Sequence, residues 1–205
     1  MKGLIFTLAA LSAYLVSGWN PSITFSKLIY KKDIRTCGSK NPGFTNFRRC
    51  FGDKFAWYVF VLDLFKAAAV VAVFAFLLSK YGVDHQFAAA FTGVFAVLGH
   101  AYPIWYGFKG GKGFLVSLSV IFVIDWRVGL IATLIMVVLL LTTKYMSLST
   151  VTALLASPVI MILFDTALPV VEITTLTVIF VAIRHKENFK RLKNGTESKF
   201  CLKAR

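Results

Sequence analysis

Residues 55–79 read FAWYVFVLDLFKAAAVVAVFAFLLS, an almost wholly apolar run that contains only two charged side chains, Asp63 and Lys66. About 20 apolar residues in a helix cross the hydrocarbon core of a bilayer, so this run is long enough to span one. The two charges are three positions apart, which places them on the same face of a helix. We therefore expect a transmembrane helix in which Asp63 and Lys66 pair with each other, in preference to a separate functional role.

The composition of the whole chain agrees with this stretch. Of its 205 residues, 58% are hydrophobic and 16% are charged, whereas soluble domains are typically about 45–50% apolar. The net charge of +14 comes from basic residues that flank apolar runs and do not form one stripe, which disfavours nucleic-acid binding. The three cysteines show neither metal-ligand spacing nor an even-numbered framework, so free thiols in a reducing compartment are expected.

The chain is predicted to be an all-α integral membrane protein with a single polytopic domain, residues 1–205. The first apolar run is interpreted as a retained helix and not as a signal peptide, because only Lys2 precedes it and further apolar runs follow. Seven transmembrane helices are expected, at residues 3–25, 55–79, 85–101, 112–124, 128–143, 148–164 and 168–184. The third and fourth are short, which leaves five or six true spans as an alternative.

Basic residues fix the expected orientation. With the N-terminus outside and the C-terminus in the cytoplasm, the segments 26–54, 102–112, 144–147 and 184–205 all lie inside. They hold 8, 2, 1 and 8 Lys/Arg residues, which makes 19 of the 23, whereas only three fall outside. The positive-inside rule favours this arrangement, and it places every polar-rich connection on the cytoplasmic face.

The first of three polar stretches on that face is CGSKNPGFTNFRRC, residues 37–50. It combines turn-forming residues and short hydrogen-bond donors with Arg48 and Arg49, whose guanidinium groups suit phosphate oxygens. A solvated basic loop of the positive-inside kind is an equal alternative for the two arginines.

The second stretch is FKGGKG, residues 108–113, where glycine offers backbone N–H groups and lysine offers charge to an anion. It is not a Walker A loop, because Tyr106 stands where that motif requires glycine, and a nucleoside triphosphatase is disfavoured. A plain charged turn between two helices is the alternative. His100, just upstream, is expected to satisfy a helix end more readily than to act as a base.

The third stretch is RHKENFKRLKNGTESKF, residues 184–200, directly after the last predicted span. If the helix continues, Arg184, Asn188 and Arg191 share one face, with His185 beside them. Histidine is the side chain best suited to move a proton near neutral pH. A basic juxtamembrane segment that attracts anionic lipid headgroups is the alternative.

Taken together, these stretches place two glycine-rich loops, basic groups and a histidine beside apolar helices. Such a combination suits a phosphorylated headgroup held at the interface while an acyl chain lies among the helices. From residue chemistry alone, we expect the chain to bind a phosphate-bearing amphiphile.

The same stretches resemble the three motifs of the bacterial acyl-phosphate:glycerol-3-phosphate acyltransferases, the PlsY family. Residues 38–46 (GSKNPGFTN) with Arg49 resemble the first motif, 99–103 (GHAYP) with 108–113 the second, and 184–197 the third. The motifs occur in the family order and at family-like spacing, so the resemblance covers nearly the whole chain.

The resemblance implies a seven-helix enzyme of the bacterial plasma (inner) membrane, with its site facing the cytoplasm. The implied reaction transfers an acyl group from acyl phosphate to the 1-hydroxyl of glycerol 3-phosphate, giving lysophosphatidic acid and phosphate, the first acylation step of phospholipid synthesis. The implied partners are these two substrates, the lipid bilayer and an enzyme that produces acyl phosphate. No cofactor or metal is implied.

The site residues come from the motif matches. Arg49 and Lys112 match essential cations that hold phosphate charge, and His185 and Asn188 match a pair expected beside glycerol 3-phosphate. Residues expected to contact phosphate or to support the site are Ser39, Asn41, Gly43, Thr45, Asn46, Gly110, Gly111, Gly113, Thr150 and Glu197, the last with a structural role.

Two residues of the first motif depart from the family pattern. Lys40 replaces a usual glycine, and Phe44 replaces a usual alanine. A glycine at position 40 would tolerate a positive φ, which lysine adopts less readily.

Acyl phosphate is an activated mixed anhydride, so the implied reaction requires no nucleophile from the enzyme. The base is either His185 or a phosphate oxygen of the substrate, and the absence of a carboxylate–His pair in the motifs favours the substrate. The main rival function is a transporter or flippase for a phosphorylated lipid or metabolite, but we find no inverted repeat of the kind common in such folds. A structural protein that only binds anionic lipid is a third possibility.

Overall fold

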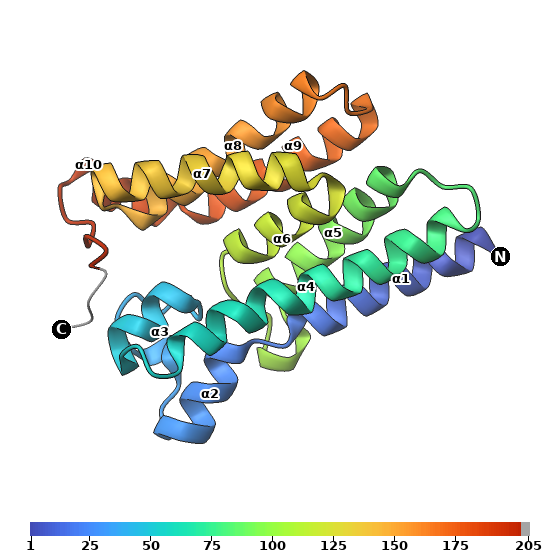
Figure 1. Ribbon diagram of the computed structural model, residues 1–205. Helices are drawn as coiled ribbons and strands as arrows, with labels where there is room; N and C mark the ends of the chain where they lie inside the picture. The colour runs from blue at the N-terminus through green and yellow to red at the C-terminus, as the bar shows by residue number, and fades with distance from the viewer. Residues whose placement is uncertain (202–205) are drawn as a thin grey trace.

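Helices run side by side through the protein in a computed structural model that describes residues 1–201 (Figure 1). Lys203 and Arg205, which were counted among the cytoplasmic charges, lie outside the described residues. The helices are α1 (Lys2–Gly18), α2 (Pro21–Tyr30), η1 (Ile34–Thr36), α3 (Phe44–Phe51), α4 (Ala56–Ser79), α5 (His85–Ala101), η2 (Ile104–Tyr106), α6 (Phe114–Ile124), α7 (Trp126–Thr143), α8 (Met146–Leu163), α9 (Leu168–Arg184) and α10 (Lys186–Lys193).

Most predicted spans correspond to single helices. The expected ranges 85–101 and 168–184 are the bounds of α5 and α9, and the ranges expected for α4, α6, α7 and α8 agree within two residues at each end. Long apolar runs bounded by charged or turn-forming residues define such helices well. The paired charges of the quoted stretch are also confirmed, since Lys66 Nζ lies 2.8 Å from Asp63 Oδ1.

The span predicted over residues 3–25 lies within the apolar segment Lys2–Tyr30, which consists of two helices and not one. Helix α1 ends at Gly18, and α2 begins at Pro21. Asn20 caps the second helix, because its side-chain oxygen accepts a hydrogen bond of 3.0 Å from the Ile23 N–H. Proline at the first helical position is preorganised to start a helix, so the sequence Asn20-Pro21 separates the two.

Five helical segments are long and apolar enough to cross a membrane: Lys2–Tyr30, Ala56–Ser79, His85–Tyr106, Trp126–Thr143 and Met146–Leu163. A sixth is formed if α9 and α10, which meet at an angle of 54°, count as one span, while α6 is a shorter apolar helix. The all-helical membrane class is therefore confirmed. The count of seven spans and the orientation stay predictions.

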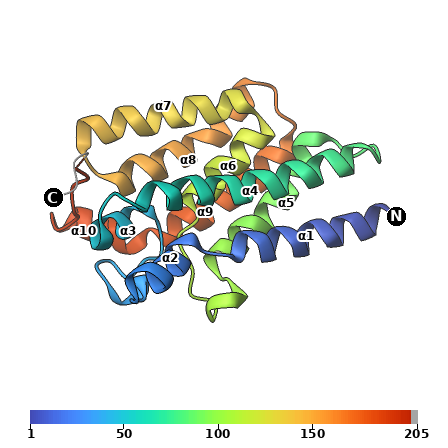
Figure 2. The same ribbon diagram turned by 60° about the horizontal axis from the view of Figure 1, so that its bottom comes forward.

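Small side chains fill the centre of the bundle, and large apolar ones cover its outside. Ala9, Ala13 and Ala89 are fully buried, whereas Phe65 and Leu134 are 70% and 62% exposed. Helix α1 packs on α4 and α5, α7 packs on α8, and α6 lies between the two groups (Figures 1 and 2). Close approach through small residues, with large apolar side chains facing outward, is typical of helices packed in lipid.

The connections that carry the three polar stretches gather at one end of the bundle. Helices α2, α3 and α10 lie at this end, and the N-terminus lies at the opposite one (Figures 1 and 2). The order of the helices explains the second loop and the start of α8: α5 ends and α6 begins at this end, and α7 ends and α8 begins there too. The fold thus brings together residues that are far apart in the sequence, such as Arg48 and Cys201, which are 153 positions apart.

Candidate active site

A cavity of about 710 Å³ opens at this end of the bundle. Its wall is formed by the loop before α3, the starts of α6 and α8, the bent α9–α10 junction and the C-terminal segment, residues 197–201. All the predicted site residues line it except Gly110 and Gly111. The predicted set is therefore brought together almost completely, although it comes from the three polar stretches and, for Thr150, from α8.

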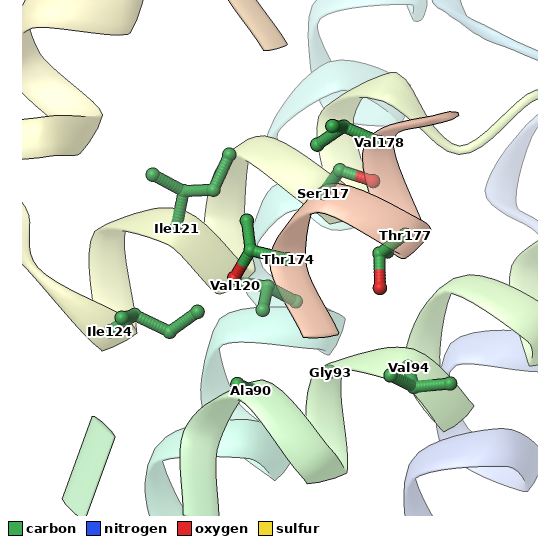
Figure 3. Close-up of a pocket in the computed structure, with 10 residues that line it drawn as sticks. All are labelled: Ala90, Gly93, Val94, Ser117, Val120, Ile121, Ile124, Thr174, Thr177 and Val178. Atoms are coloured by element: carbon green, nitrogen blue, oxygen red, sulfur yellow. The ribbon is translucent and has the colours of Figure 1, made fainter. Parts of the chain in front are cut away.

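A second cavity, between α5, α6 and α9, has a different character (Figure 3). Its volume is about 10 Å³, which is room for one water molecule at most. Apolar side chains dominate its lining, and it contains none of the predicted site residues. It is a packing defect between helices and not a candidate substrate site.

The first loop is held by a side chain that was expected to contact phosphate. Asn46, at the start of α3, accepts a hydrogen bond of 2.8 Å from the Ser39 N–H and donates one of 2.9 Å to the carbonyl oxygen of Cys37. Lys40 adopts a φ of 60°, so the positive φ suspected at this departure from the family pattern is present. The Asn46 amide therefore shapes the loop that presents Ser39 to the cavity.

The expectation of three free thiols is wrong for two of them. Cys37 and Cys50 form a disulfide, with their Cα atoms 6.3 Å apart, whereas Cys201 is free and exposed. Helix α3 folds back over the loop and brings Cys50 to Cys37. This helix was not predicted from the turn-forming composition of residues 37–50, so the pairing was not visible in the sequence.

The two neighbouring arginines have different roles in the structure. Arg48 is buried, forms an ion pair with Asp53 and donates a hydrogen bond to the carbonyl oxygen of Cys201. Arg49 is exposed and lines the cavity, and its guanidinium forms no ion pair with the described residues 1–201. Only Arg49 therefore offers an uncommitted cation to a ligand.

Gly110 and Gly111 face the end of α5 and not the cavity. The N–H of Gly110 donates to the carbonyl oxygen of Ala101 at 3.2 Å, and the N–H of Gly111 donates to that of His100 at 3.1 Å. A Cβ atom at Gly111 would lie 2.2 Å from His100 Nε2, so only glycine permits this close approach. Both glycines therefore shape the turn, and neither N–H is available to bind phosphate.

Lys112 is the cation that this turn directs into the cavity, where its ammonium group donates a hydrogen bond to Asn188 Oδ1. Burial is the main cause that lowers the pKa of Lys112 to about 8, and the charges of Arg191, Arg184 and Arg49 lower it further. Lys112 therefore stays mainly protonated at pH 7.

The third stretch does not continue α9 as one straight helix, which corrects the single face expected for Arg184, Asn188 and Arg191. The axis bends by 54° between α9 and α10. Asn188 and Arg191 line the cavity, whereas Arg184 donates hydrogen bonds of 3.2 and 2.9 Å to the carbonyl oxygen of Gly111. The bend separates a residue that supports the second loop from two that face the ligand space.

His185 lies at the bend and is held in one orientation. Its Nδ1 is 2.8 Å from the carbonyl oxygen of Val181. Since a carbonyl can only accept, the proton of the neutral ring is on Nδ1, and the lone pair is on Nε2. Burial lowers the pKa of His185 to about 4, and this outweighs the opposing effect of the bond to Val181. At neutral pH the ring is uncharged and offers one acceptor nitrogen.

Neighbouring side chains engage both carboxylate oxygens of Glu197. One carboxylate oxygen accepts hydrogen bonds from Ser147 and Asn188, at 2.8 and 2.7 Å, and the other accepts one of 2.7 Å from Arg191. Burial raises the pKa of Glu197, but these hydrogen bonds outweigh it and hold the pKa below its ordinary value. Glu197 thus connects α8, α10 and the C-terminal segment around the cavity.

Sequence reasoning missed several residues that line the cavity. Phe60 from α4 and Met136 from α7 are apolar residues within long apolar runs, so nothing in the sequence separates them from their neighbours. Asp63 and His100 also line the cavity, although the sequence favoured structural roles for both. Thr150, which was predicted as a site residue, lines the cavity, and its hydroxyl donates hydrogen bonds to the carbonyl oxygens of Met146 and Ser147.

Charge distinguishes the cavity most clearly. Its lining contains five Lys/Arg residues, Arg48, Arg49, Lys112, Arg191 and Lys199, but only two acidic ones, Asp63 and Glu197. The site is therefore suited to an anion, and its aromatic and aliphatic lining also suits an apolar group. The fold and the site together define a class: helical membrane proteins that handle an anionic amphiphile.

Comparison with known proteins identifies the family within this class. Residues 7–195 match the glycerol-3-phosphate acyltransferase family. The chain is 37% identical to the glycerol-3-phosphate acyltransferase of Aquifex aeolicus, over 98% of this chain and 100% of the relative. It is also 37% identical to that of Listeria welshimeri, over 94% of this chain and 95% of the relative.

Solved structures support the same assignment. The crystal structure of PlsY (YgiH), an integral membrane glycerol 3-phosphate acyltransferase, in its glycerol 3-phosphate form, matches with a TM-score of 0.88 and 31% identity, over 96% of both chains. Its lysophosphatidic acid form matches with a TM-score of 0.84, over 96% of this chain and 95% of that one. The chain belongs to the glycerol-3-phosphate acyltransferase family.

Proposed function

We propose that this protein transfers an acyl group from acyl phosphate to the 1-hydroxyl of glycerol 3-phosphate, releasing 1-acylglycerol 3-phosphate (lysophosphatidic acid) and phosphate. The observation that carries the proposal is the cationic surplus of a cavity that also has apolar walls. The solved relatives, in glycerol 3-phosphate and lysophosphatidic acid forms, support the acceptor and the product. The donor is inferred from the three sequence motifs.

Two cations hold the phosphate charge in this proposal. Arg49 lacks an ion-pair partner among residues 1–201, and Lys112 is paired only with the neutral amide of Asn188. Both substrates are phosphorylated, so bringing them together costs electrostatic repulsion that cationic groups offset. The same groups stabilise the negative charge that develops on the departing phosphate.

The chemical step needs little beyond alignment. The 1-hydroxyl oxygen attacks the carbonyl carbon of acyl phosphate, the bond from that carbon to the bridging oxygen breaks, and phosphate leaves with the electron pair. A phosphate oxygen of the substrate takes the hydroxyl proton. Because acyl phosphate is already activated, holding the two reactants in this geometry supplies most of the acceleration.

In this proposal His185 and Asn188 orient the acceptor. The unprotonated Nε2 of His185 accepts a hydrogen bond from a glycerol hydroxyl, and its neutral state at pH 7 agrees with this role. The fixed hydrogen bond to Val181 keeps the ring from turning. His185 is a binding residue here and not the base.

The acyl chain is proposed to lie along the apolar side of the cavity. Phe60, Leu115 and Met136 form part of its wall and come from α4, α6 and α7. These residues lie within helices of the membrane bundle, so a chain bound there leaves the phosphorylated end beside Arg49 and Lys112.

The orientation is proposed from charge. With the N-terminus outside, 19 of the 23 Lys/Arg residues lie in the cytoplasm, and the cavity opens toward it. We therefore infer a seven-span protein of the bacterial plasma membrane that acts with a cytosolic enzyme producing acyl phosphate. Labelling of single introduced cysteines with a membrane-impermeant maleimide tests this topology. Reaction from outside at the α3–α4 loop would reverse it.

The proposed activity is tested with purified protein in detergent or liposomes. Acyl phosphate and glycerol 3-phosphate are supplied together, and phosphate release and the lipid product are both followed. We expect release that depends on glycerol 3-phosphate and a 1-acyl product. Product formed only from acyl-CoA would overturn the donor. Glycerol 3-phosphate uptake into liposomes without any acylated product would instead support the rival transporter.

A further inference from the structure

An ionic cluster is buried directly beneath the second loop. Asp63 and Lys66 of α4 and His100 of α5 are 1%, 7% and 5% exposed. Lys66 Nζ lies 2.8 Å from Asp63 Oδ1, 3.2 Å from His100 Nδ1 and 2.5 Å from the carbonyl oxygen of Trp19. An ammonium group only donates, so Nδ1 of His100 accepts from Lys66 and carries no proton. Lys66 thereby fixes the tautomer and the orientation of the His100 ring.

His100 contacts the second loop in two ways. Its carbonyl oxygen accepts the N–H of Gly111, and the edge of its ring lies so close that a Cβ atom on Gly111 would be 2.2 Å from Nε2. From the other side, Arg184 binds the carbonyl oxygen of Gly111. Hydrogen bonds therefore hold Gly111 at both its N–H and its carbonyl oxygen. The next residue is Lys112, whose side chain enters the cavity.

A contribution to the stability of the fold does not by itself explain why these three charged or polar side chains are buried here. An ion pair among membrane helices costs desolvation, and apolar residues of similar volume often stabilise a protein as well or better. A polar link nearby already exists without charge, since Ser119 of α6 donates a hydrogen bond of 3.0 Å to the carbonyl oxygen of Leu64 in α4. Within the cluster, His100 contacts Gly111 of the second loop, so the role of the charges is to be sought in the position of that loop.

We propose that Asp63, Lys66 and His100 are positioning residues for the phosphate-binding lysine. The ion pair of Asp63 and Lys66 holds the His100 ring beneath Gly111, and this fixes the turn that directs Lys112 into the cavity. The inference rests on the proposed function, because it requires that Lys112 bind a phosphate group of the substrate.

The test removes both charges together in the double variant Asp63→Asn/Lys66→Met, so that no unpaired charge remains buried. We expect the dissociation constant and the KM for glycerol 3-phosphate to rise about tenfold or more, since small displacements of binding groups have effects of this size. The melting temperature should change little. Ser119→Ala is the matched control, a buried polar link between α4 and α6 outside the cavity, and it should leave the KM unchanged.

A double-mutant cycle separates positioning from a general structural effect. Affinity for glycerol 3-phosphate is measured by calorimetry in the Lys112→Ala background. If the cluster acts through Lys112, removing its charges there adds less than about a twofold further loss. A full additional loss would overturn the proposal, and so would unchanged affinity in a folded Asp63→Asn/Lys66→Met protein.

A second variant covers the case in which the double variant does not fold. His100→Asn keeps the ion pair and removes the ring beneath Gly111, and we expect the same rise in KM and the same coupling to Lys112. An unchanged KM in folded His100→Asn overturns the proposal. The proposed function is tested separately, by whether the wild-type protein binds and acylates glycerol 3-phosphate at all.

Discussion

The two ends of the helix bundle use the same kinds of charged residues in opposite ways. At the end away from the cavity, Asp125 caps α7 and pairs with Arg127, with 2.7 Å between the carboxylate and the guanidinium. Asp84 accepts the Phe87 N–H and so caps α5. At the cavity end, Arg49 has no ion-pair partner among residues 1–201, and Lys112 contacts a neutral amide.

This difference concerns where the neutralising charge comes from. At the far end, Arg127 finds its partner Asp125 two residues away, so the local sequence neutralises this guanidinium and a ligand has nothing to add. At the cavity end, the lining keeps five cations against two acids, and a bound anion completes the balance. Charge removal should therefore have large effects at one end and small ones at the other.

Removing Arg49 should give the largest effect. For Arg49→Ala we expect turnover to fall about 10²–10³-fold, the loss typical of a group that stabilises charge developing in the transition state. The matched variant at the far end is Arg127→Ala, which should stay within about twofold because this guanidinium pairs with Asp125 and lies over the Phe164 ring, away from the cavity. The rate of phosphate release, measured for both variants, compares the two effects on turnover. Similar losses at both ends would remove the distinction between them.

The second loop has two lysines, Lys109 and Lys112, whose effects on activity should differ. Lys112→Ala should lower kcat/KM for glycerol 3-phosphate about 10²-fold, because a half-buried contact between the ammonium group and phosphate is lost. Lys109 does not line the cavity and is exposed, so Lys109→Ala should change kcat/KM less than about twofold. Initial rates over a range of glycerol 3-phosphate concentrations measure both. Equal effects would mean that the loop acts only through its total charge.

The pH dependence should reflect Lys112. Its charged form predominates below its pKa of about 8, so phosphate binding is intact at pH 7 and is lost as the pH rises through that value. We expect kcat/KM for glycerol 3-phosphate to fall by up to about tenfold per pH unit above this pKa. The fall should be absent in Lys112→Arg, whose guanidinium keeps its charge. An alkaline fall of the same size in that variant would assign the titration to another group.

His185→Gln should have a smaller effect than loss of either cation. Glutamine can still accept a hydrogen bond, so we expect the KM for glycerol 3-phosphate to rise about tenfold while kcat stays near normal. A loss of about 10³-fold in kcat would instead make His185 the base. Saturating and subsaturating rates at pH 7 distinguish the two outcomes.

The disulfide should matter least for turnover. Asn46 already joins Cys37 to Ser39, so the loop keeps its shape when Cys37 and Cys50 are both changed to Ser. We expect turnover within about twofold of wild type, and a melting temperature lower by roughly 5 °C, because the unfolded chain loses a cross-link. Asn46→Ala is the contrasting variant, and its turnover should fall further. If loss of the disulfide has the larger effect on turnover, the loop depends on the cross-link.

The helices could be predicted largely because hydrophobic length is a local property. The predicted span 168–184 has the same bounds as α9, Leu168–Arg184. The short helix α3 could not be predicted in the same way, since the glycine, proline and asparagine before it indicate a turn, and its helical state depends on packing of Phe47 and Phe44 in the core. The disulfide between Cys37 and Cys50 could not be predicted either, because Cys50 is on this helix.

The site could be predicted as a set of residues but not as a set of contacts. Arg48 and Arg49 are neighbours of the same type and both line the cavity, but only the fold pairs Arg48 with Asp53 and leaves Arg49 without an ion pair among residues 1–201. Gly110 and Gly111 were assigned to phosphate because glycine-rich turns often expose N–H groups. Whether those groups are free depends on the carbonyl oxygens at the end of α5, which sequence spacing does not reveal.

The C-terminal segment has a practical consequence for handling this protein. Phe200 N–H donates a hydrogen bond of 2.7 Å to the Lys144 carbonyl oxygen, and Arg48 binds the carbonyl of Cys201, so the last described residues form part of the cavity wall. Only eight residues, 198–205, would separate Glu197 from an affinity tag fused after Arg205. The N-terminus lies at the other end of the bundle (Figure 1), and a tag or a surface-tethering group attached there would leave the cavity wall untouched.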